Sequence, residues 1–308
     1  MKIFAGDSNP GLATSIANRL GLELGDVRLK RFSDGEMAVK YRDNIRGSDL
    51  FIIQSTSPPA DNILQLLLML DAARRSSARR ITAVLPYFGY ARQDRKDQPR
   101  VAIGAKLVAD LLVSAGADRV LTMDLHAAQI QGFFNIPFDH IYASTVFIPY
   151  WMSRDRVDLT VLAPDIGSIK MARAYAQRLD AGLAVIDKRR PEPNSSEVMN
   201  LIGEVENRNV LILDDMVDTA GTISLAAKTV LERGATTVRC ACTHPVLSGP
   251  ALSRIAESGI NEFTITDTLP LRDEVDSDMF KVLTVAGVFA EAIKRIHEEK
   301  SLSSLFVE

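Results

Sequence analysis

The sequence predicts an α/β protein with two similar domains, each a mostly parallel sheet flanked by helices. Short runs of Val, Ile and Leu alternate with helix-like segments along the whole chain. These runs are apolar throughout, which is typical of strands that helices cover on both faces. The chain has 308 residues, and at about 150 residues per domain this length suits roughly two domains.

The elements are expected in a regular order from the N-terminus. Residues 1–7 are typical of a strand and a turn. Pro10 and Gly21 are expected to begin and end the first helix, because proline suits the first helical turn and glycine suits the position after the last. Residues 63–70 indicate a second helix. Further strands are predicted at Leu50–Gln54, Ile81–Leu85, Arg119–Met123, Leu159–Ala163, Leu183–Ile186, Val210–Leu213 and Thr237–Ala241.

The second half of the chain repeats this alternation. Apolar residues from Ile223 to Leu231 recur at helical spacing, so a helix is expected there, ending at Gly234. A long helix is also expected at Ala286–Glu298. Prolines and small residues interrupt the periodicity near 137–149. We therefore expect domains at residues 1–142 and 143–299, with residues 300–308 packing on the first domain.

Composition narrows the class of protein. Apolar residues make up 46% of the chain, and the formal net charge is −3. Nucleic-acid-binding proteins more often carry a basic excess, so nucleic acid is not an expected partner. No apolar run is long enough to span a bilayer, and the N-terminus lacks the apolar core of a signal peptide. We expect a cytoplasmic protein with no membrane partner, in which Cys240 and Cys242 are buried, reduced thiols.

The strongest chemical signal follows the apolar run Val210–Leu213. Two adjacent acids come first, then a loop of small residues, and then a helix. Small residues let backbone N–H groups approach an anion, and the helix N-terminus adds its positive end. Carboxylates accept hydrogen bonds from sugar hydroxyls or bind a metal ion. We therefore expect a sugar-phosphate site formed by Asp214, Asp215, Asp218, Thr219, Ala220, Gly221 and Thr222. The alternative is a plain turn in which Asp218 or Thr219 caps the helix.

This string resembles the phosphoribosyl diphosphate binding motif of type I phosphoribosyltransferase-like proteins, and the chain as a whole resembles the ribose-phosphate diphosphokinases. Five stretches carry the resemblance, in the order that the family has them. They are Arg31–Glu36, Tyr90–Lys96, Asp124–Phe134, Asp187–Pro191 and Asp214–Thr222.

The resemblance implies a phosphoribosyltransferase-like fold in both domains. It also implies an enzyme that transfers diphosphate from ATP to the C1 hydroxyl of ribose 5-phosphate, giving 5-phosphoribosyl 1-diphosphate and AMP for nucleotide and amino-acid biosynthesis. Mg²⁺ is the implied metal ion, and dimers that assemble into a homohexamer are the implied oligomer. Such a transfer depends on in-line positioning and on cations around the spreading charge.

The polar segment Asp187–Glu197 is expected to be a mobile loop between two strands. The resemblance implies that Lys188 and Arg190 in this segment are catalytic, and that Arg190 also binds substrate. Mobile cations can close over phosphates and neutralise charge that develops in the transition state. Taken without the resemblance, the segment is more typical of a solvated basic run.

The resemblance implies that His126 and Asp165 bind the magnesium ion. Asp124 and His126 follow the predicted strand Arg119–Met123 and are two residues apart, so alternation places both on one face at its carboxyl end. Imidazole is a less usual magnesium ligand than oxygen, so His126 is expected to act partly through water.

A purine site is expected in the first domain. The ring of Phe32 can stack on a base, and nearby carboxylates can accept hydrogen bonds from its amino group. Arg92 and Gln93 supply donors for a nucleotide. We therefore expect ATP to bind to Phe32, Asp34, Gly35, Glu36, Arg92 and Gln93, and the resemblance implies this for Asp34–Glu36 and Arg92–Gln93.

One stretch differs from the common pattern of the family, and one basic cluster lies outside its catalytic motifs. Residues 166–168 are Ile-Gly-Ser where many relatives have His-Gly-Gly, so no catalytic histidine is expected there. The cations of Arg74–Arg80 suit a helix C-terminus. Alternatively, some of them form an effector site for phosphate or ADP, with candidates Arg46, Ser77, Arg79, Ser301 and Ser303.

Two other functions remain open at this point. A phosphoribosyltransferase would explain the loop at 214–222 but not the nucleotide-binding stretches or a second α/β half. A non-catalytic relative would regulate or scaffold, although the retention of Lys188, Arg190 and the acids argues against that role.

Overall fold

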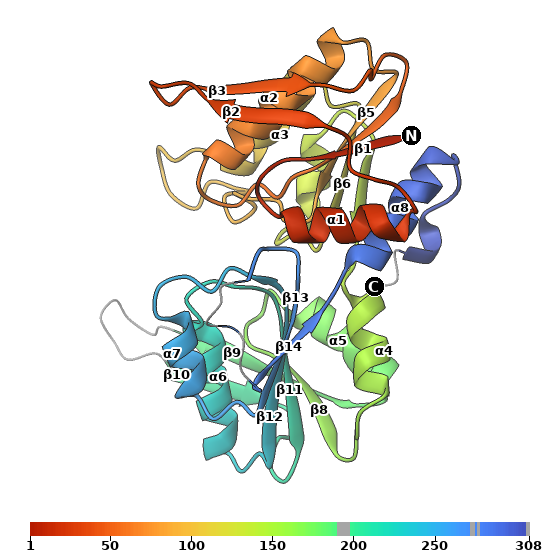
Figure 1. Ribbon diagram of the computed structural model, residues 1–308. Helices are drawn as coiled ribbons and strands as arrows, with labels where there is room; N and C mark the ends of the chain where they lie inside the picture. Colours follow the sequence, from red (N-terminus) through yellow and green to blue (C-terminus); the bar gives the residue numbers. More distant parts are fainter. Residues whose placement is uncertain (190–197, 272–274, 276–277, 306–308) are drawn as a thin grey trace. The chain divides into compact units, whose positions relative to one another are not determined.

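The computed structural model describes residues 1–189, 198–271, 275 and 278–305. The chain divides into two compact units. Unit 1 comprises Met1–Tyr142, Thr268–Pro270 and Thr284–Val307, and unit 2 comprises mainly Ala143–Asp267 and Leu271–Leu283. Each unit is a mostly parallel sheet flanked by helices (Figure 1), which confirms the predicted fold class.

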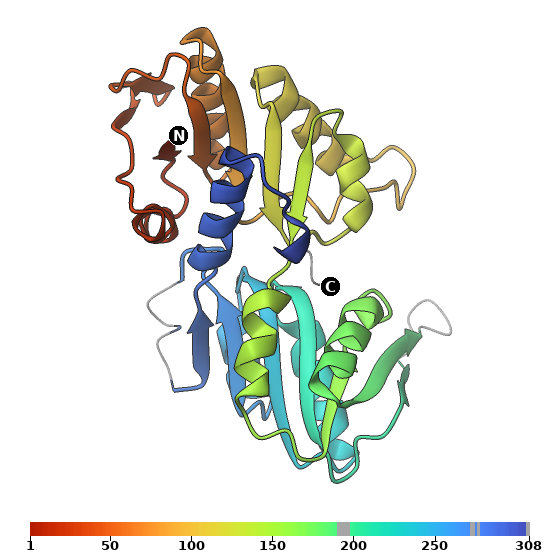
Figure 2. The same ribbon diagram turned by 90° about the vertical axis from the view of Figure 1, so that its right-hand side faces the viewer.

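Unit 1 is built on a five-stranded parallel sheet in which the strands follow one another in chain order. The strands are β1 (Lys2–Ala5), β4 (Asp49–Ile53), β5 (Arg80–Leu85), β6 (Arg119–Met123) and β7 (Phe138–Ile141). The helices are α1 (Pro10–Arg19), α2 (Asp61–Arg75), α3 (Gly104–Ala115), α8 (Ala286–His297) and the short 3₁₀ helices η1 (Ala128–Phe133) and η3 (Ser303–Leu305). Figure 2 shows α8 and α2 over opposite faces of this sheet.

Local sequence explains the ends of α1. Asn9 caps the helix by accepting a hydrogen bond from the Leu12 N–H at 3.2 Å, and Pro10 occupies the first turn. Gly21 follows the helix with a φ of +67°, a conformation that glycine adopts without steric cost. The helix therefore begins and ends where the sequence predicts, within two residues.

Outside this sheet, unit 1 has an antiparallel hairpin of β2 (Val27–Arg31) and β3 (Met37–Tyr41). The edge of the Tyr41 ring packs against Phe4 of β1, with ring centroids 4.8 Å apart. This hairpin was not predicted from the sequence, because its strands mix charged and apolar residues.

Unit 2 has a seven-stranded sheet with the order β10-β9-β8-β11-β12-β13-β14, in which only β10 is antiparallel to its neighbour. The strands are β8 (Leu159–Ala163), β9 (Gly182–Arg189), β10 (Val198–Ile202), β11 (Asn209–Val217), β12 (Thr237–Pro245), β13 (Glu262–Thr266) and β14 (Phe280–Leu283). Its first strand thus lies inside the sheet, whereas the first strand of unit 1 lies at an edge.

Helices cover both faces of this second sheet. The helices α4 (Ser144–Met152) and α5 (Ile169–Leu179) lie on one face, and α6 (Gly221–Glu232) and α7 (Ala251–Ala256) lie on the other (Figure 1). Cys240 and Cys242 of β12 are fully buried and unbonded to each other, as predicted. Burial raises the pKa of both thiols well above its ordinary value, which keeps them protonated.

The last helix corrects the expected domain division. The sequence analysis assigned residues 143–299 to the second domain, but residues 284–299 belong to unit 1. The helix α8 buries an apolar face, including Phe289 and Ile293, and a partly buried ionic cluster also holds it to unit 1. The Arg80 guanidinium donates to both carboxylate oxygens of Asp49, at 2.8 and 2.6 Å, and to the Ile296 carbonyl of α8 at 2.9 Å. The imidazole of His297 completes the cluster, with Nδ1 2.7 Å from the Asp49 carboxylate.

The charge of Asp49 is stabilised by these partners. Burial alone would raise the pKa of its carboxyl, but the hydrogen bonds from Arg80 and His297 outweigh burial and hold the pKa below its ordinary value. The ionised form therefore stabilises the fold at pH values above the ordinary carboxyl pKa, and this stabilisation is lost as the pH falls through the lowered pKa.

We expect Asp49→Asn to lower the free energy of unfolding of unit 1 at pH 7 by about 3 kcal/mol. This is the lower end for breaking a buried ion pair, because a quarter of the Arg80 side chain contacts solvent. The difference from wild type should shrink in acid, as the pH falls through the lowered pKa of Asp49 and the wild-type carboxyl also protonates. Urea denaturation at pH 7 and over a series of acidic pH values tests this. Asp71→Asn, which removes the exposed ion pair with Arg75, is the control and should cost under about 0.5 kcal/mol. Equal losses in the two variants at pH 7 would contradict the cluster's role.

Candidate active site

The residues that the sequence analysis singled out lie at the carboxyl ends of the parallel strands. In unit 2, Asp165 follows β8, residues 218–220 follow β11, and Ser248 follows β12. Since β8, β11 and β12 are adjacent and parallel, these ends meet at one edge of the sheet. In unit 1, Arg92 and Gln93 follow β5, and His126 follows β6.

The strand β11 is longer than predicted. It runs to Val217, so Asp214 and Asp215 lie within the strand rather than after it, and Asp214 is in register with Cys242 of β12. The turn into α6 is made at Ala220, whose φ of +57° places it in the left-handed region although it is not glycine. Such backbone strain is typical of ligand-binding turns.

The turn contains backbone N–H groups that are suited to bind an anion. Among the described residues, the N–H groups of Thr219, Ala220 and Gly221 donate to no acceptor. The helix α6 begins at Gly221, and its N-cap residue is Ala220 rather than Asp218 or Thr219, so the side chain at the N-cap accepts no hydrogen bond. Consecutive donors at the positive end of a helix suit a phosphate group.

The carbonyl groups of the same loop are occupied by a neighbouring segment. The N–H groups of Leu247 and Ser248 donate to the carbonyls of Val217 and Asp218, both at 2.9 Å. The Ser248 hydroxyl also donates to the Asp218 carboxylate. The loop is therefore held with its carbonyls turned towards residues 247–248, away from an anion. Ser248 was not predicted as a site residue, because its only signal is its place after β12, the strand adjacent to β11.

Three acids crowd the edge formed by β8 and β11. Burial, together with the negative charges of Asp215 and Asp165, raises the pKa of Asp214 well above its ordinary value. The Asp215 N–H donates to the Asp214 carboxylate at 3.0 Å, which partly offsets this effect. A group that binds through such acids must supply hydrogen-bond donors or positive charge, as sugar hydroxyls and cations do.

The Asp165 carboxylate is oriented by the first turn of α5. Its Oδ1 accepts hydrogen bonds from the N–H and the hydroxyl of Ser168, at 3.0 and 2.9 Å. Ser168 is the last residue of the Ile-Gly-Ser stretch that differs from the common family pattern. The second oxygen, Oδ2, accepts no hydrogen bond from any described residue. No group of three metal-binding side chains is found among the residues that the structure describes.

The predicted catalytic cations lie at the limit of the described chain. Lys188 is on β9, where its backbone pairs with Met199 of β10. It therefore belongs to a strand rather than to a loop, which corrects the expectation for the start of the segment 187–197. Arg190 lies outside the described residues.

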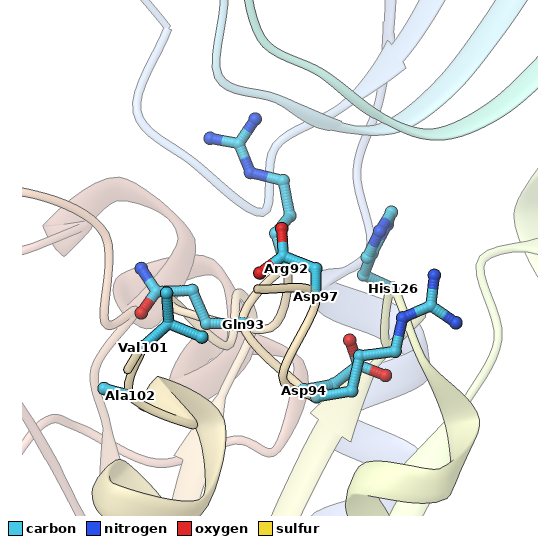
Figure 3. A pocket seen from close by; sticks show the side chains of 8 residues that line it. Arg92, Gln93, Asp94, Asp97, Val101, Ala102 and His126 are labelled. Carbon is cyan, nitrogen blue, oxygen red and sulfur yellow. The ribbon is translucent and has the colours of Figure 1, made fainter. Parts of the chain in front are cut away.

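In unit 1, a pocket of about 320 Å³ lies between the loop after β5 and the loop after β6 (Figure 3). The hydrogen bond from the Gln129 amide to the Asp94 carboxylate, 2.6 Å long, joins the two loops. The pocket brings the predicted residues Arg92, Gln93 and His126 together, and Figure 3 shows Arg92 and His126 extending to the same side. The lining consists of Arg92, Gln93, Asp94, Arg95, Asp97, Val101, Ala102 and His126. Its arginines and histidine suit phosphate groups.

The hairpin tip between β2 and β3 presents the other predicted nucleotide ligands. Phe32 is half exposed, and Asp34, Gly35 and Glu36 are also exposed. The Phe32 N–H donates to the Glu36 carbonyl at 2.8 Å, and the Lys30 ammonium lies 4.4 Å from the centre of the Phe32 ring. The exposed ring at the tip is therefore that of Phe32, on a turn closed by a backbone hydrogen bond. None of the tip residues lines the pocket.

Comparisons with known proteins agree along the whole chain. The family model described as the N-terminal domain of ribose phosphate pyrophosphokinase matches residues 1–116, and the phosphoribosyl synthetase-associated domain matches residues 189–307. The ribose-phosphate pyrophosphokinase of Chlorobaculum tepidum is 57% identical over 99% of this chain and 95% of its own length. That of Clostridium tetani is 54% identical over 99% of this chain and 97% of its own length.

A solved structure extends this similarity to three dimensions. The phosphoribosylpyrophosphate synthetase of Mycobacterium smegmatis is 39% identical, and its crystal structure matches with a TM-score of 0.92. The match covers 97% of this chain and 99% of that one.

Proposed function

This chain belongs to the ribose-phosphate pyrophosphokinase family, and we propose that the loop between β11 and α6 holds the 5-phosphate of its sugar substrate. The enzyme transfers diphosphate from ATP to the C1 hydroxyl of ribose 5-phosphate, giving 5-phosphoribosyl 1-diphosphate and AMP for nucleotide and amino-acid biosynthesis. The full-length similarity decides against the phosphoribosyltransferase alternative.

One observation carries the assignment of the sugar site. The N–H groups of Thr219, Ala220 and Gly221 donate to no described acceptor, and they belong to a strained turn. The carbonyls that precede them accept hydrogen bonds from residues 247–248. A phosphate accepts several such donors at once. The hydroxyls of Thr219 and Thr222 add donors, and Asp214, Asp215 and Asp218 would accept hydrogen bonds from the ribose hydroxyls.

ATP would be bound by unit 1. The pocket supplies Arg92 and Gln93 for the phosphate groups. The hairpin tip supplies Phe32 to stack on adenine, with Asp34, Gly35 and Glu36 beside it. None of the tip residues lines the pocket of the same chain, so we propose that the tip contributes to the ATP site of a neighbouring subunit. The proposed oligomer is a hexamer assembled from dimers.

Magnesium fits the donors available in unit 2. Mg²⁺ usually binds to one or two carboxylates together with water and substrate phosphates, rather than to a full set of protein ligands. Asp165 suits this role, because Ser168 orients its carboxylate and leaves Oδ2 available. His126, which lies in unit 1, is also proposed as a magnesium ligand that acts partly through water. The ion would neutralise charge on the transferred phosphates.

Lys188 and Arg190 would act on the same charge. In diphosphate transfer, the C1 hydroxyl attacks the β-phosphorus, and negative charge spreads over the equatorial oxygens and the leaving AMP. Cations from this segment would stabilise that charge, and Arg190 would also contact the substrate.

The remaining assignments concern location and partners. No helix among the described residues is long and apolar enough to cross a membrane. We propose a cytoplasmic enzyme whose partners are ATP, ribose 5-phosphate and copies of itself, with no nucleic-acid or membrane partner.

The products of the reaction provide the direct test. The purified protein with Mg²⁺, ATP and ribose 5-phosphate should release AMP and a sugar with a diphosphate on C1, both of which ³¹P NMR distinguishes. Formation of ADP, or no sugar diphosphate, would contradict the function and favour a non-catalytic relative. Ribose in place of ribose 5-phosphate should give little product, since it lacks the group that the loop binds.

Replacement of the proposed catalytic lysine should act on the transition state. We expect Lys188→Ala to lower kcat by a factor of about 10² to 10⁴ with small changes in KM, because its charge is needed mainly as the transferred group becomes charged. Steady-state kinetics measure both constants. Lys228→Ala, which removes an exposed lysine of α6, is the matched control. A near-normal kcat in Lys188→Ala would refute the catalytic assignment.

The glycine at the start of α6 gives a graded test of the phosphate loop. A Cβ at Gly221 would lie 3.5 Å from the Arg254 guanidinium and 3.9 Å from the Thr219 hydroxyl, so the fold accommodates it. Larger side chains would enter the space proposed for the phosphate. Calorimetry should show a loss of ribose 5-phosphate affinity that grows from Gly221→Ala to Gly221→Val, while ATP affinity stays nearly constant. Equal losses for both ligands would place the sugar phosphate elsewhere.

A further inference from the structure

An arginine of α7 stands beside the loop that ends at Gly221. The Arg254 Nη1 donates to the Thr219 carbonyl at 3.0 Å. The same nitrogen is 3.5 Å from the place that a Cβ on Gly221 would occupy. Arg254 belongs to α7, which follows β12 and Ser248 along the chain.

The charge of Arg254 is not balanced by an acid. Among the residues that the structure describes, Arg254 forms no ion pair, and the single hydrogen bond of its side chain is the one to Thr219. Its guanidinium is exposed, with the remaining N–H groups available. An exposed arginine beside a backbone carbonyl is common by itself. Here, however, it adjoins the N–H groups of Thr219, Ala220 and Gly221, which donate to no described acceptor.

We propose that Arg254 is a phosphate-binding and positioning residue for ribose 5-phosphate. One arm of its guanidinium holds the Thr219 carbonyl, which keeps that oxygen turned away from the anion. Another arm donates to an oxygen of the 5-phosphate. The proposal rests on the assignment of the loop to the sugar phosphate, and it adds a side-chain charge to a site otherwise made of backbone donors and hydroxyls.

The chemistry of arginine suits both tasks at once. Its planar guanidinium has several donors in a fixed fork, so it can bind a carbonyl and a phosphate oxygen at the same time. The ammonium of lysine is a point charge on a flexible stem and would keep the attraction but lose the fixed geometry. Arg254 would thereby favour sugars that carry a doubly charged phosphate over neutral sugars.

The test compares variants that separate charge from structure. We expect Arg254→Ala to raise the KM and the Kd for ribose 5-phosphate about tenfold to a hundredfold, the usual loss for a charge-assisted hydrogen bond. The KM for ATP and the melting temperature should stay close to wild type. Arg254→Lys should recover part of the affinity, whereas the uncharged Arg254→Gln should not.

A second arginine of unit 2 provides the matched control. The Arg239 guanidinium also donates to a backbone carbonyl, that of Asp155, at 3.5 Å. Arg239→Ala should leave the KM for both substrates unchanged. If Arg254→Ala raises the two KM values equally, or lowers only the melting temperature, the residue is structural and the proposal is wrong.

The result for Gly221 distinguishes this proposal from the one on which it rests. If Gly221→Val weakens ribose 5-phosphate binding and Arg254→Ala does not, the loop binds the phosphate without Arg254. If neither variant affects ribose 5-phosphate binding, the loop itself is not the phosphate site and both proposals fail.

Discussion

The parallel pairing of β8, β11 and β12 is the constraint on which the proposed sugar site depends. Parallel neighbours end at the same edge of the sheet, so residues far apart in sequence are placed together there. This arrangement brings Asp165 close to Asp214 and places Ser248 beside the loop after β11. The cost is electrostatic, since burial and the neighbouring acids raise the pKa of Asp214. A ligand that supplies donors or positive charge relieves this repulsion.

The loop is preorganised by contacts on its far side. Ala220 and Leu247 both have a positive φ, and the Leu247 N–H donates to the Val217 carbonyl. Ser248 then binds both the backbone and the carboxylate of Asp218. Because the fold holds these strained residues in place, an incoming phosphate does not need to order the loop, and less of its binding energy is lost to that ordering.

Sequence reasoning predicted the elements that depend on local patterns. Apolar runs gave the buried strands, and Pro10 and Gly21 gave the limits of α1. The predictions failed where pairing between strands distant in sequence determines how far an element extends. Asp214 extends β11 because β12 pairs with it, and Lys188 extends β9 because β10 does. The prediction placed α8 in the wrong domain, because the ionic cluster that contacts it is built from three distant segments and has no local signature in the sequence.

The same distinction holds for the candidate site. The loop at 218–222 could be predicted because its residues are contiguous in the sequence. That Arg92 and His126 line the same pocket could be inferred only from the resemblance and the fold, because they are distant in the sequence. Ser248 and Arg254 carry no motif. Their only signal is positional, because they follow β12, which the structure places next to β11.

The most direct test of the account is a crystal structure of the protein with ribose 5-phosphate bound. The account predicts that oxygens of the 5-phosphate lie within hydrogen-bonding distance of the N–H groups of Thr219, Ala220 and Gly221, with the ribose hydroxyls turned towards Asp214 and Asp215. A phosphate bound in the pocket of Arg92 and His126, with the loop at 218–222 not in contact with the sugar, would contradict it.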